Sequence, residues 1–329
     1  MNERPLLSCI IPAYNSSKTI ERAVYSLIDQ GLGDDLQIII ADDDSPTPFF
    51  YLVENDFYQF KHNIYVRIPP HPNHTPAYTQ YYAMRWVTGQ YMINLDHDDF
   101  IVQDSLKKII EKIKKENSKN HVTQIITNPL YLWRDGIVEE EEAGLVLTHG
   151  KIYDVDFIRA NNIKFENRKM YQDLQFNLHF YLHMICQHSL ELYLDDNFYV
   201  WTDEPTSITH QNPEMHEKHY AEFMYKAHKS TLNLYRNRYY DIQPPAERER
   251  VLCFFIDGLI GLAKTYSDAY KVQRHFFTKQ TAKDIMAAFE VELDRIIEEL
   301  KKEWGSEHEP TAKEIIEILT NGKELYLCF

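Results

Sequence analysis

Short apolar runs alternate with amphipathic stretches along the N-terminal part of the chain, and each run ends in polar or turn-forming residues. Successive apolar positions are typical of a strand that is covered on both faces. Such runs predict strands over residues 6–11, 36–41, 63–68, 91–95, 124–127 and 190–193, the first of them ended by Pro12. Apolar spacings of three and four residues predict helices after Ile20, after an N-cap at Asp104, and over residues 174–186. This alternation predicts an α/β fold with a mostly parallel sheet flanked by helices.

The pattern changes near residue 212. Beyond it, long helical patterns follow one another with few turn residues between them. We therefore expect two domains, an α/β domain over residues 1–212 and an all-helical C-terminal domain over residues 213–329. The apolar stripes of these helices fit a bundle core as well as a homo-oligomer interface. Within the first domain, the acidic run Glu139–Glu142 is expected to lie in a solvated loop.

Composition excludes several classes of protein. The chain has a net charge of -15, which argues against a nucleic-acid binder because such proteins need basic surface to neutralise phosphates. Aromatic residues make up 13% of the chain, too many for a disordered protein. The four cysteines are far apart and no secretory signal precedes the first strand, so we expect a cytoplasmic protein, or one at the inner face of the membrane. The longest apolar region, 251–263, is interrupted by Asp257 and too short for a transmembrane span.

Two clusters of carboxylates follow predicted strands, at the ends where ligands bind in open α/β sheets. Asp96, Asp98 and Asp99 follow the strand over residues 91–95, and a tight turn there can direct carboxylates at one Mg²⁺ or Mn²⁺ ion. The second cluster, residues 42–44, follows the second strand. Each cluster taken alone also fits a polar turn or, for the first, a helix cap.

Asp173 stands directly before an apolar helical pattern. As a general base it would take a proton from a hydroxyl nucleophile. As a helix N-cap, the alternative, it would accept backbone N–H bonds, and these would lower its pKa. Among the 15 histidines, His74 and His210 are expected to lie near the presumed site.

Several segments occur together in one order, and this order carries more information than any single segment. They are Ile10–Asn15, Asp42–Ser45, Leu95–Asp99, Gly150–Tyr153, Asn161–Phe165, Tyr171–Asp173 and Ser207–Thr209. In this order and spacing, residues 6–210 resemble the family 2 glycosyltransferases. The resemblance implies a GT-A fold and an inverting transfer of sugar from a nucleoside diphosphate donor, most often a UDP-sugar. The implied acceptor is a hydroxyl group on a glycan, a surface polymer or a glycoprotein.

The resemblance also implies roles for individual residues. Asp173 matches the general base, and Asp98 and Asp96 match the part of the D-x-D region that binds Mn²⁺ or Mg²⁺, with Asp99 as a further candidate ligand. The positions that match the nucleotide-sugar site are Pro12, Tyr14, Asp42, Asp43, Asp96 and Asp98. For the C-terminal domain, acceptor binding and oligomer formation both stay open.

Three departures from the family pattern change details of the implied site. Asp44 stands where the family usually has Gly, which reduces the expected backbone freedom of that turn. Gln172 replaces the usual Glu, and residues 79–83 lack the Arg of the family's Ala-Arg-Asn stretch. Two rival interpretations remain, a nucleotidyltransferase and a non-catalytic sugar- or protein-binding module with the same fold.

Overall fold

The computed structural model describes residues 4–47, 49, 63–71, 75–144, 147–166 and 172–205, together with Ser230 and Leu234. The chain divides into two units, Met1–Gln211 and Asn212–Phe329, and all described segments except the two single residues belong to the first. The expected helical domain over residues 213–329 lies outside the described residues, so its structure and its boundary stay predictions. Within the described part, no helix combines the length and the apolarity needed to cross a membrane.

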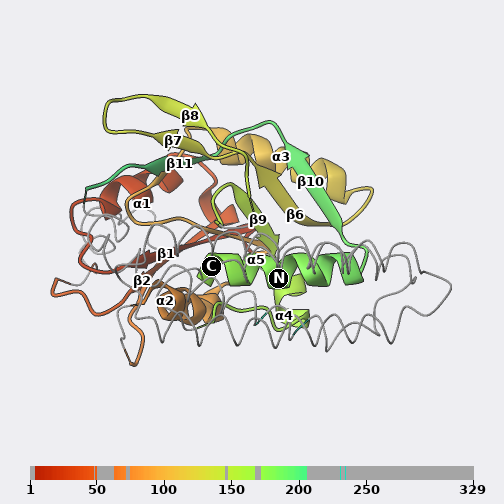
Figure 1. Ribbon diagram of the computed structural model, residues 1–329, viewed down its shortest axis with the longest axis horizontal. Helices are drawn as coiled ribbons and strands as arrows, with labels where there is room; N and C mark the ends of the chain where they lie inside the picture. Colours follow the sequence, from red (N-terminus) through yellow and green to blue (C-terminus); the bar gives the residue numbers. More distant parts are fainter. Residues whose placement is uncertain are drawn as a thin grey trace, which may run out of the picture. The chain divides into compact units, whose positions relative to one another are not determined.

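A seven-stranded sheet forms the centre of the first unit, in the order β10-β6-β9-β4-β1-β2-β3 (Figure 1). Its strands are β1 (Leu7–Ala13), β2 (Leu36–Asp42), β3 (Ile64–Arg67), β4 (Tyr91–Asn94), β6 (Val122–Thr127), β9 (Lys151–Asp154) and β10 (Leu190–Leu194). Strand β9 runs antiparallel to both of its neighbours, and the other pairs are parallel. The prediction of a mostly parallel sheet is confirmed, and the antiparallel β9 was not predicted.

Helices cover both faces of this sheet. Helices α1 (Ile20–Ile28) and α3 (Ser105–Asn117) lie on one face, and α2 (Pro76–Ala83), α4 (Val155–Ala160) and α5 (Gln172–Cys186) lie on the other (Figure 1). Along β1, Cys9 and Ile11 belong to the core beneath α1 and α3, whereas Ile10 belongs to the core beneath α5. Because both faces of the sheet are buried, the strand needs apolar residues at nearly every position. Such an unbroken apolar run can be recognised in the sequence as a strand. Two short 3₁₀ turns, η1 (Gly33–Asp35) and η4 (Met84–Trp86), complete these connections.

A second, four-stranded sheet has the order β5-β11-β7-β8. Its strands are β5 (Phe100–Ile101), β7 (Leu130–Leu132), β8 (Val138–Glu140) and β11 (Tyr199–Thr202). The expectation that residues 139–142 form a loop was wrong for Glu139 and Glu140, which pair with β7 as an edge strand. They are nonetheless exposed, because charged side chains are tolerated on an edge strand that faces water.

Two further expectations were wrong in detail. Pro12 lies within β1 and does not end it. Pro12 lies two residues after Ile10, so its backbone groups point to the same neighbouring strand. That strand is β4, because the Ile10 carbonyl accepts from the Leu95 N–H. The missing N–H of Pro12 therefore falls beyond the last β1–β4 pair, where no ladder bond is lost. Asp104 does precede α3, but it adopts a left-handed conformation with φ 57° and its side chain makes no capping hydrogen bond.

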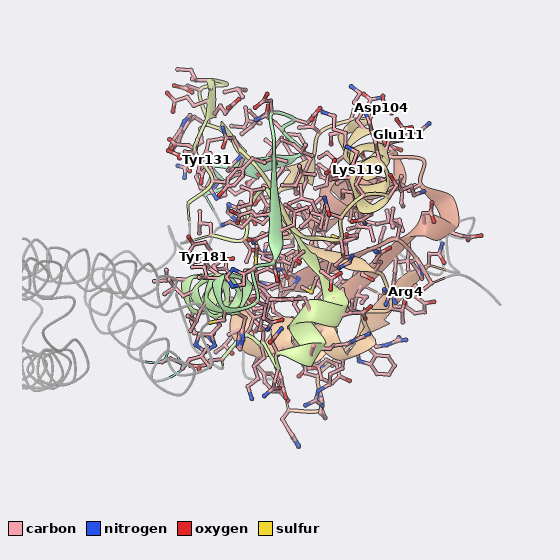
Figure 2. All side chains as sticks on the ribbon, turned by 90° about the vertical axis from the view of Figure 1, so that its right-hand side faces the viewer. Arg4, Asp104, Glu111, Lys119, Tyr131 and Tyr181 are labelled. Carbon is pink, nitrogen blue, oxygen red and sulfur yellow. The ribbon has the colours of Figure 1, made fainter. Side chains whose placement is uncertain are left out.

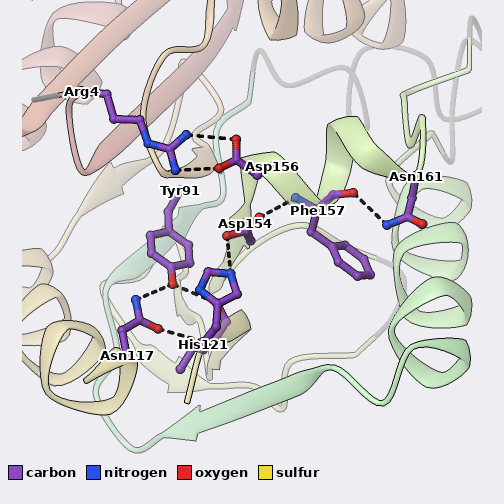
Figure 3. A network of polar contacts seen from close by, with 9 residues as sticks. Arg4, Tyr91, Asn117, His121, Asp154, Asp156, Phe157 and Asn161 are labelled. Carbon is purple, nitrogen blue, oxygen red and sulfur yellow. Dashed lines mark hydrogen bonds and ion pairs between the residues drawn. The ribbon is translucent and has the colours of Figure 1, made fainter. Parts of the chain in front are cut away.

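A polar network fixes β9 between its neighbours (Figure 3). Asp154, at the end of β9, accepts from the N–H of Phe157 and caps α4, while its other oxygen lies 2.8 Å from His121 Nε2. Buried Tyr91 of β4 donates its hydroxyl to the Val122 carbonyl of β6 at 2.8 Å. Asn117 of α3 donates to the same hydroxyl, also at 2.8 Å. The network positions β9, and the opposite end of β9 carries the turn of the candidate site.

Candidate functional site

The carboxyl ends of three parallel strands meet at one edge of the large sheet. Strand β1 lies between β2 and β4, with Ala13 opposite Asp42 and Ile10 opposite Asn94. The residues that follow β2 and β4 therefore flank the end of β1, as expected for the ligand edge of a parallel sheet. The predicted site residues at this edge are Pro12, Tyr14, Asp42, Asp43, Asp96, Asp98 and Asp99.

The turn after β2 is tied to the end of β1. Asp42 is fully buried and accepts from the Ser45 N–H at 3.0 Å, while the Ser45 hydroxyl accepts from the Asn15 N–H at 2.8 Å. Burial raises the pKa of Asp42. Asp43 is also buried, and its N–H donates to the carbonyl of Ala13 at 2.8 Å. These contacts hold Asp42 and Asp43 next to the end of β1, where the chain continues into Tyr14.

Asp44 takes the backbone conformation that the family pattern assigns to glycine. Its φ is +64°, in the left-handed region. Aspartate visits this region more readily than most residues because its short polar side chain can hydrogen-bond locally, but it does so at a cost that glycine avoids. The turn geometry is therefore kept here despite the substitution, at the expense of backbone strain.

The three carboxylates after β4 have different surroundings. Asp99 is 1% exposed, and its two oxygens accept from the Tyr199 hydroxyl at 2.5 Å and from the Thr202 N–H at 2.8 Å. Burial, with the charges of Asp96 and Asp98, raises the pKa of Asp99 well above its usual range. Asp98 is partly exposed, and its backbone carbonyl accepts from the guanidinium of a neighbouring arginine. Asp99 thus anchors β11, while Asp96 and Asp98 are partly exposed.

His149 joins Asp96 at this edge and was not singled out from the sequence. It is 5% exposed, and its Nε2 lies 3.4 Å from a carboxylate oxygen of Asp96. Its ring stacks on Tyr199, with centroids 4.5 Å apart and planes 13° from parallel. The only available signal was its position directly before Gly150-Lys151, one of the segments that carry the family resemblance. His74 and His210 lie outside the described residues.

Hydrogen bonding to His149 gives Asp96 a lowered pKa, unlike the other acids of the site whose pKa values shift. Desolvation alone would raise its pKa, but the hydrogen bond and the charge of His149, with the charge of His97, bring the pKa of Asp96 below its usual value. Ligand atoms of Asp96, Asp99 and His149 all lie within 4.8 Å of one another. The second ring nitrogen of His149 is buried and has no hydrogen-bond partner among the described residues. This set of oxygen and imidazole donors fits a divalent cation such as Mn²⁺.

A glycine turn presents His149 to the site. Gly150 has φ +72°, and a Cβ at this position would lie 2.2 Å from the carbonyl oxygen of Thr127 in β6. The Thr127 N–H in turn donates to the Gly150 carbonyl at 2.8 Å. Lys151 is buried, burial lowers its pKa to about 8, and its ammonium donates to the carbonyls of Gly144 and Leu147. Only glycine fits where the chain passes this close to β6.

Asp173 lies on the other side of the same turn. It occupies the first turn of α5, and one of its oxygens accepts from the Thr148 hydroxyl at 3.4 Å. Its other oxygen is buried, with no hydrogen-bond partner in the described part of the chain. Burial, reinforced by the negative charge of Asp96, raises the pKa of Asp173 to about 6, against the opposing charges of His149 and Lys151.

This environment differs from that of a helix cap. Asp173 follows Gln172, the first residue of α5, so it lies inside the helix and not at the position before it. Burial raises its pKa, although a backbone hydrogen bond from Thr148 acts in the opposite direction. Two adjacent residues of the turn contact the two carboxylates, since the Thr148 hydroxyl donates to Asp173 and the His149 ring lies against Asp96, each at 3.4 Å. The structure therefore brings Asp173 together with Asp96, which lie far apart in the sequence.

Comparison with known proteins gives a consistent result. The family model described as Glycosyl transferase family 2 matches residues 8–196. An uncharacterized glycosyltransferase of Haemophilus influenzae is 27% identical over 160 residues, which cover 49% of this chain and 60% of that protein. The chondroitin synthase of Escherichia coli is 32% identical over 114 residues, covering 35% of this chain and 16% of the synthase. The chain thus spans less than two thirds of the length of these relatives.

Solved structures resemble the chain more widely. Residues 1–349 of S. aureus TarS in complex with UDP-GlcNAc have a TM-score of 0.65 at 16% identity, covering 97% of this chain and 91% of that one. The mannosyltransferase PcManGT from Pyrobaculum calidifontis, in complex with GDP-Man and Mn²⁺, has a TM-score of 0.53 at 12% identity, covering 99% and 88%. At these identities the likeness concerns the fold, and it confirms the predicted fold class.

Proposed function

The chain belongs to glycosyl transferase family 2, and we propose that it moves a sugar from a nucleoside diphosphate donor to an acceptor hydroxyl with inversion at the anomeric carbon. The observation that carries this proposal is the pairing of two unlike carboxylates at one turn. The pKa of Asp96 is lowered and that of Asp173 is raised to about 6. Two acids whose surroundings move their pKa values apart are typical of a site in which one carboxylate stays ionised and binds a cation or substrate, while the other transfers a proton.

The proposed donor is a UDP-sugar. TarS, whose fold this chain shares, was solved with UDP-GlcNAc. Tyr14 follows β1 and is 45% exposed, which suits a ring that stacks on a nucleobase. Asp42 and Asp43 lie beside it at the end of β2, where the family pattern assigns recognition of uracil and ribose. Pro12 contributes to the same strand end.

The proposed cofactor is Mn²⁺ or Mg²⁺. Asp96 and His149 supply oxygen and nitrogen donors on neighbouring segments. Asp98 is the ligand that the family resemblance favours, but it does not belong to the cluster of Asp96, Asp99 and His149. Asp99 is a weaker candidate, because both of its oxygens already accept hydrogen bonds from β11. When bound, such a cation offsets the negative charge that develops on the departing diphosphate.

Asp173 is proposed as the general base. Its carboxylate would take the proton from the acceptor hydroxyl while the hydroxyl oxygen forms a bond to the anomeric carbon. The bond from that carbon to the diphosphate oxygen breaks, and the diphosphate leaves with the electron pair. A base with a pKa of about 6 is largely ionised at pH 7 and is still basic enough to assist proton transfer.

A screen of UDP-, GDP- and dTDP-sugars for metal-dependent donor hydrolysis and transfer tests this function. The expected result is turnover with at least one UDP-sugar that is lost on chelation. Asp98→Ala should weaken donor binding, whereas Asp173→Asn should leave UDP binding intact and slow transfer by roughly 10²–10⁴-fold. Asp156→Asn, on an exposed carboxylate paired with Arg4, is the matched control and should behave as the wild type. Transfer by Asp173→Asn at the wild-type rate would refute the assignment of the base.

A further inference from the structure

Three large aromatic side chains lie together on one face of the four-stranded sheet. Tyr131 and Trp201 are direct neighbours on β7 and β11, with ring centroids 5.1 Å apart. Trp133 lies two residues after Tyr131 and therefore on the same face, and its ring meets that of Trp201 edge-on at 5.5 Å. Trp133 is 36% exposed, and its Nε1 donates to Glu139 at 2.7 Å. Trp201 packs against the core beneath α1 and α3, and Trp133 extends the cluster from there to solvent.

The same face continues into the candidate site. Tyr199 lies two residues before Trp201 on β11, so it projects to the same side of the sheet. Its hydroxyl bonds to Asp99, and its ring stacks on His149, which contacts Asp96. We call the rings of His149, Tyr199, Trp201, Tyr131 and Trp133 the aromatic row. It leads from the proposed donor site to an exposed tryptophan. Its member Tyr131 lies at the upper left of the first unit in Figure 2, away from Arg4 at the lower right.

Such a row has the chemistry of a carbohydrate-binding surface. The faces of pyranose rings present C–H groups that pack against aromatic rings, while their hydroxyls require polar partners at the edges. Carboxylates flank the row and can accept from those hydroxyls, since Glu139 lies directly opposite Tyr131 on β8. Contiguous exposed apolar surface marks interaction sites more often than ordinary surface does.

Charge around the aromatic row selects among possible sugars. Acidic residues lie in the hairpin of β7 and β8 and in the segments that follow β8 and β11: Asp135, Glu139, Glu140, Glu141, Glu142, Asp203 and Glu204. Two arginines of the described part reach this sheet, and each is already paired: Arg134 with Asp203 at 3.1 Å and Arg22 with Glu204 at 3.3 Å. A chain of uronic acids, sulfates or phosphates would meet repulsion here, whereas a neutral chain would not.

We propose that the aromatic row is the acceptor subsite and that its ligand is a neutral oligosaccharide. Its sugar rings stack on Trp133, Tyr131 and Trp201, and its terminal hydroxyl reaches the end of the row next to Asp173. This inference rests on the proposed function, because it names the acceptor class for the same transfer reaction.

Binding of defined tetrasaccharides to the full chain tests the proposal. The probes are neutral tetrasaccharides of glucose, mannose, galactose and N-acetylglucosamine, with the hyaluronan tetrasaccharide as the anionic counterpart, measured by saturation-transfer NMR and calorimetry. At least one neutral probe should bind more tightly than the anionic one. Trp133→Ala should weaken that binding roughly tenfold, and Trp133→Phe, which keeps a ring, should restore most of it. Trp86→Ala removes an equally exposed tryptophan that packs on Arg67, and should change nothing.

Acceptor-independent donor hydrolysis separates this inference from the proposed function. Trp133→Ala should hydrolyse the donor at the wild-type rate and show a raised KM for the acceptor. Unchanged probe binding in Trp133→Ala, tighter binding of the anionic probe, or binding of no neutral probe would each overturn the subsite while leaving the transferase assignment intact. Absence of any nucleotide-sugar turnover would instead overturn the proposed function.

Discussion

Asp173 is placed where its charge costs stability, and the cost can be measured without any substrate. Its pKa is raised from an ordinary carboxyl value of 3.8 to about 6, chiefly by burial. Between about pH 4 and pH 6 the folded protein therefore binds a proton that the unfolded chain does not. By proton linkage, the free energy of unfolding falls as the pH rises through this window. Above it, the ionised side chain destabilises the fold.

The magnitude follows from the shift. One pKa unit corresponds to about 1.4 kcal/mol, so a shift of roughly two units amounts to about 3 kcal/mol at pH 7. Asparagine has nearly the same shape, carries no charge and can still accept from the Thr148 hydroxyl. Asp173→Asn should therefore be more stable than the wild type at pH 7 by up to about 3 kcal/mol, and equal to it near pH 4. Such a gain in stability at the expense of activity is expected at a catalytic site.

Thermal unfolding followed by circular dichroism at pH 4, 5, 6 and 7 provides the assay. For a unit of this size the gain corresponds to a rise in Tm of roughly 6–12 °C at pH 7. The control is Asp156→Asn, because the hydrogen bond from Arg4 lowers the pKa of Asp156 and that exposed pair contributes at most about 1 kcal/mol. A Tm difference between wild type and Asp173→Asn that is absent at pH 7, or that does not shrink toward pH 4, would refute the reasoning.

Three other substitutions test the geometry of the site. Gly150→Ala places a Cβ against a β6 carbonyl at a positive φ and should cost more than 2 kcal/mol by denaturant unfolding, whereas Gly144→Ala, which meets nothing within 4 Å, should cost less than about 0.5. Asp44→Gly should relieve the strain of φ +64° and leave the unfolding free energy equal or higher by up to about 1 kcal/mol. Tyr199→Phe removes the donor to buried Asp99 and should destabilise the fold by about 1–3 kcal/mol in the same denaturant assay.

Local sequence patterns were sufficient where burial acts on consecutive residues. The runs that became β1, β2 and β4 are apolar because helices cover both faces of the sheet, and this requirement can be read without knowing the partners. The family resemblance likewise followed from short segments in a conserved order, and it located the carboxylates that cap these strands. Asp173 was found as a candidate, but its pattern alone did not separate a base from a helix cap.

The second sheet and the antiparallel β9 depended on distant pairing. Phe100 pairs with Val200, and Leu130 with the same residue, across long stretches of chain, and strands of two to four residues have no periodicity of their own. His149 is one histidine among 15 until a glycine turn against β6 brings it to Asp96. The aromatic row arises in the same way, since its rings come from three separate segments.

The amino-acid sequence by itself determined the α/β class, the positions of the buried strands along the chain and the family, because each depends on residues that are neighbours in the chain. Tertiary structure alone decided which acids share a site and how they differ. The pKa of Asp173 is raised chiefly by burial, and that of Asp96 is lowered by its contact with His149. Both effects come from residues distant in the chain, so the sequence around each aspartate does not reveal them.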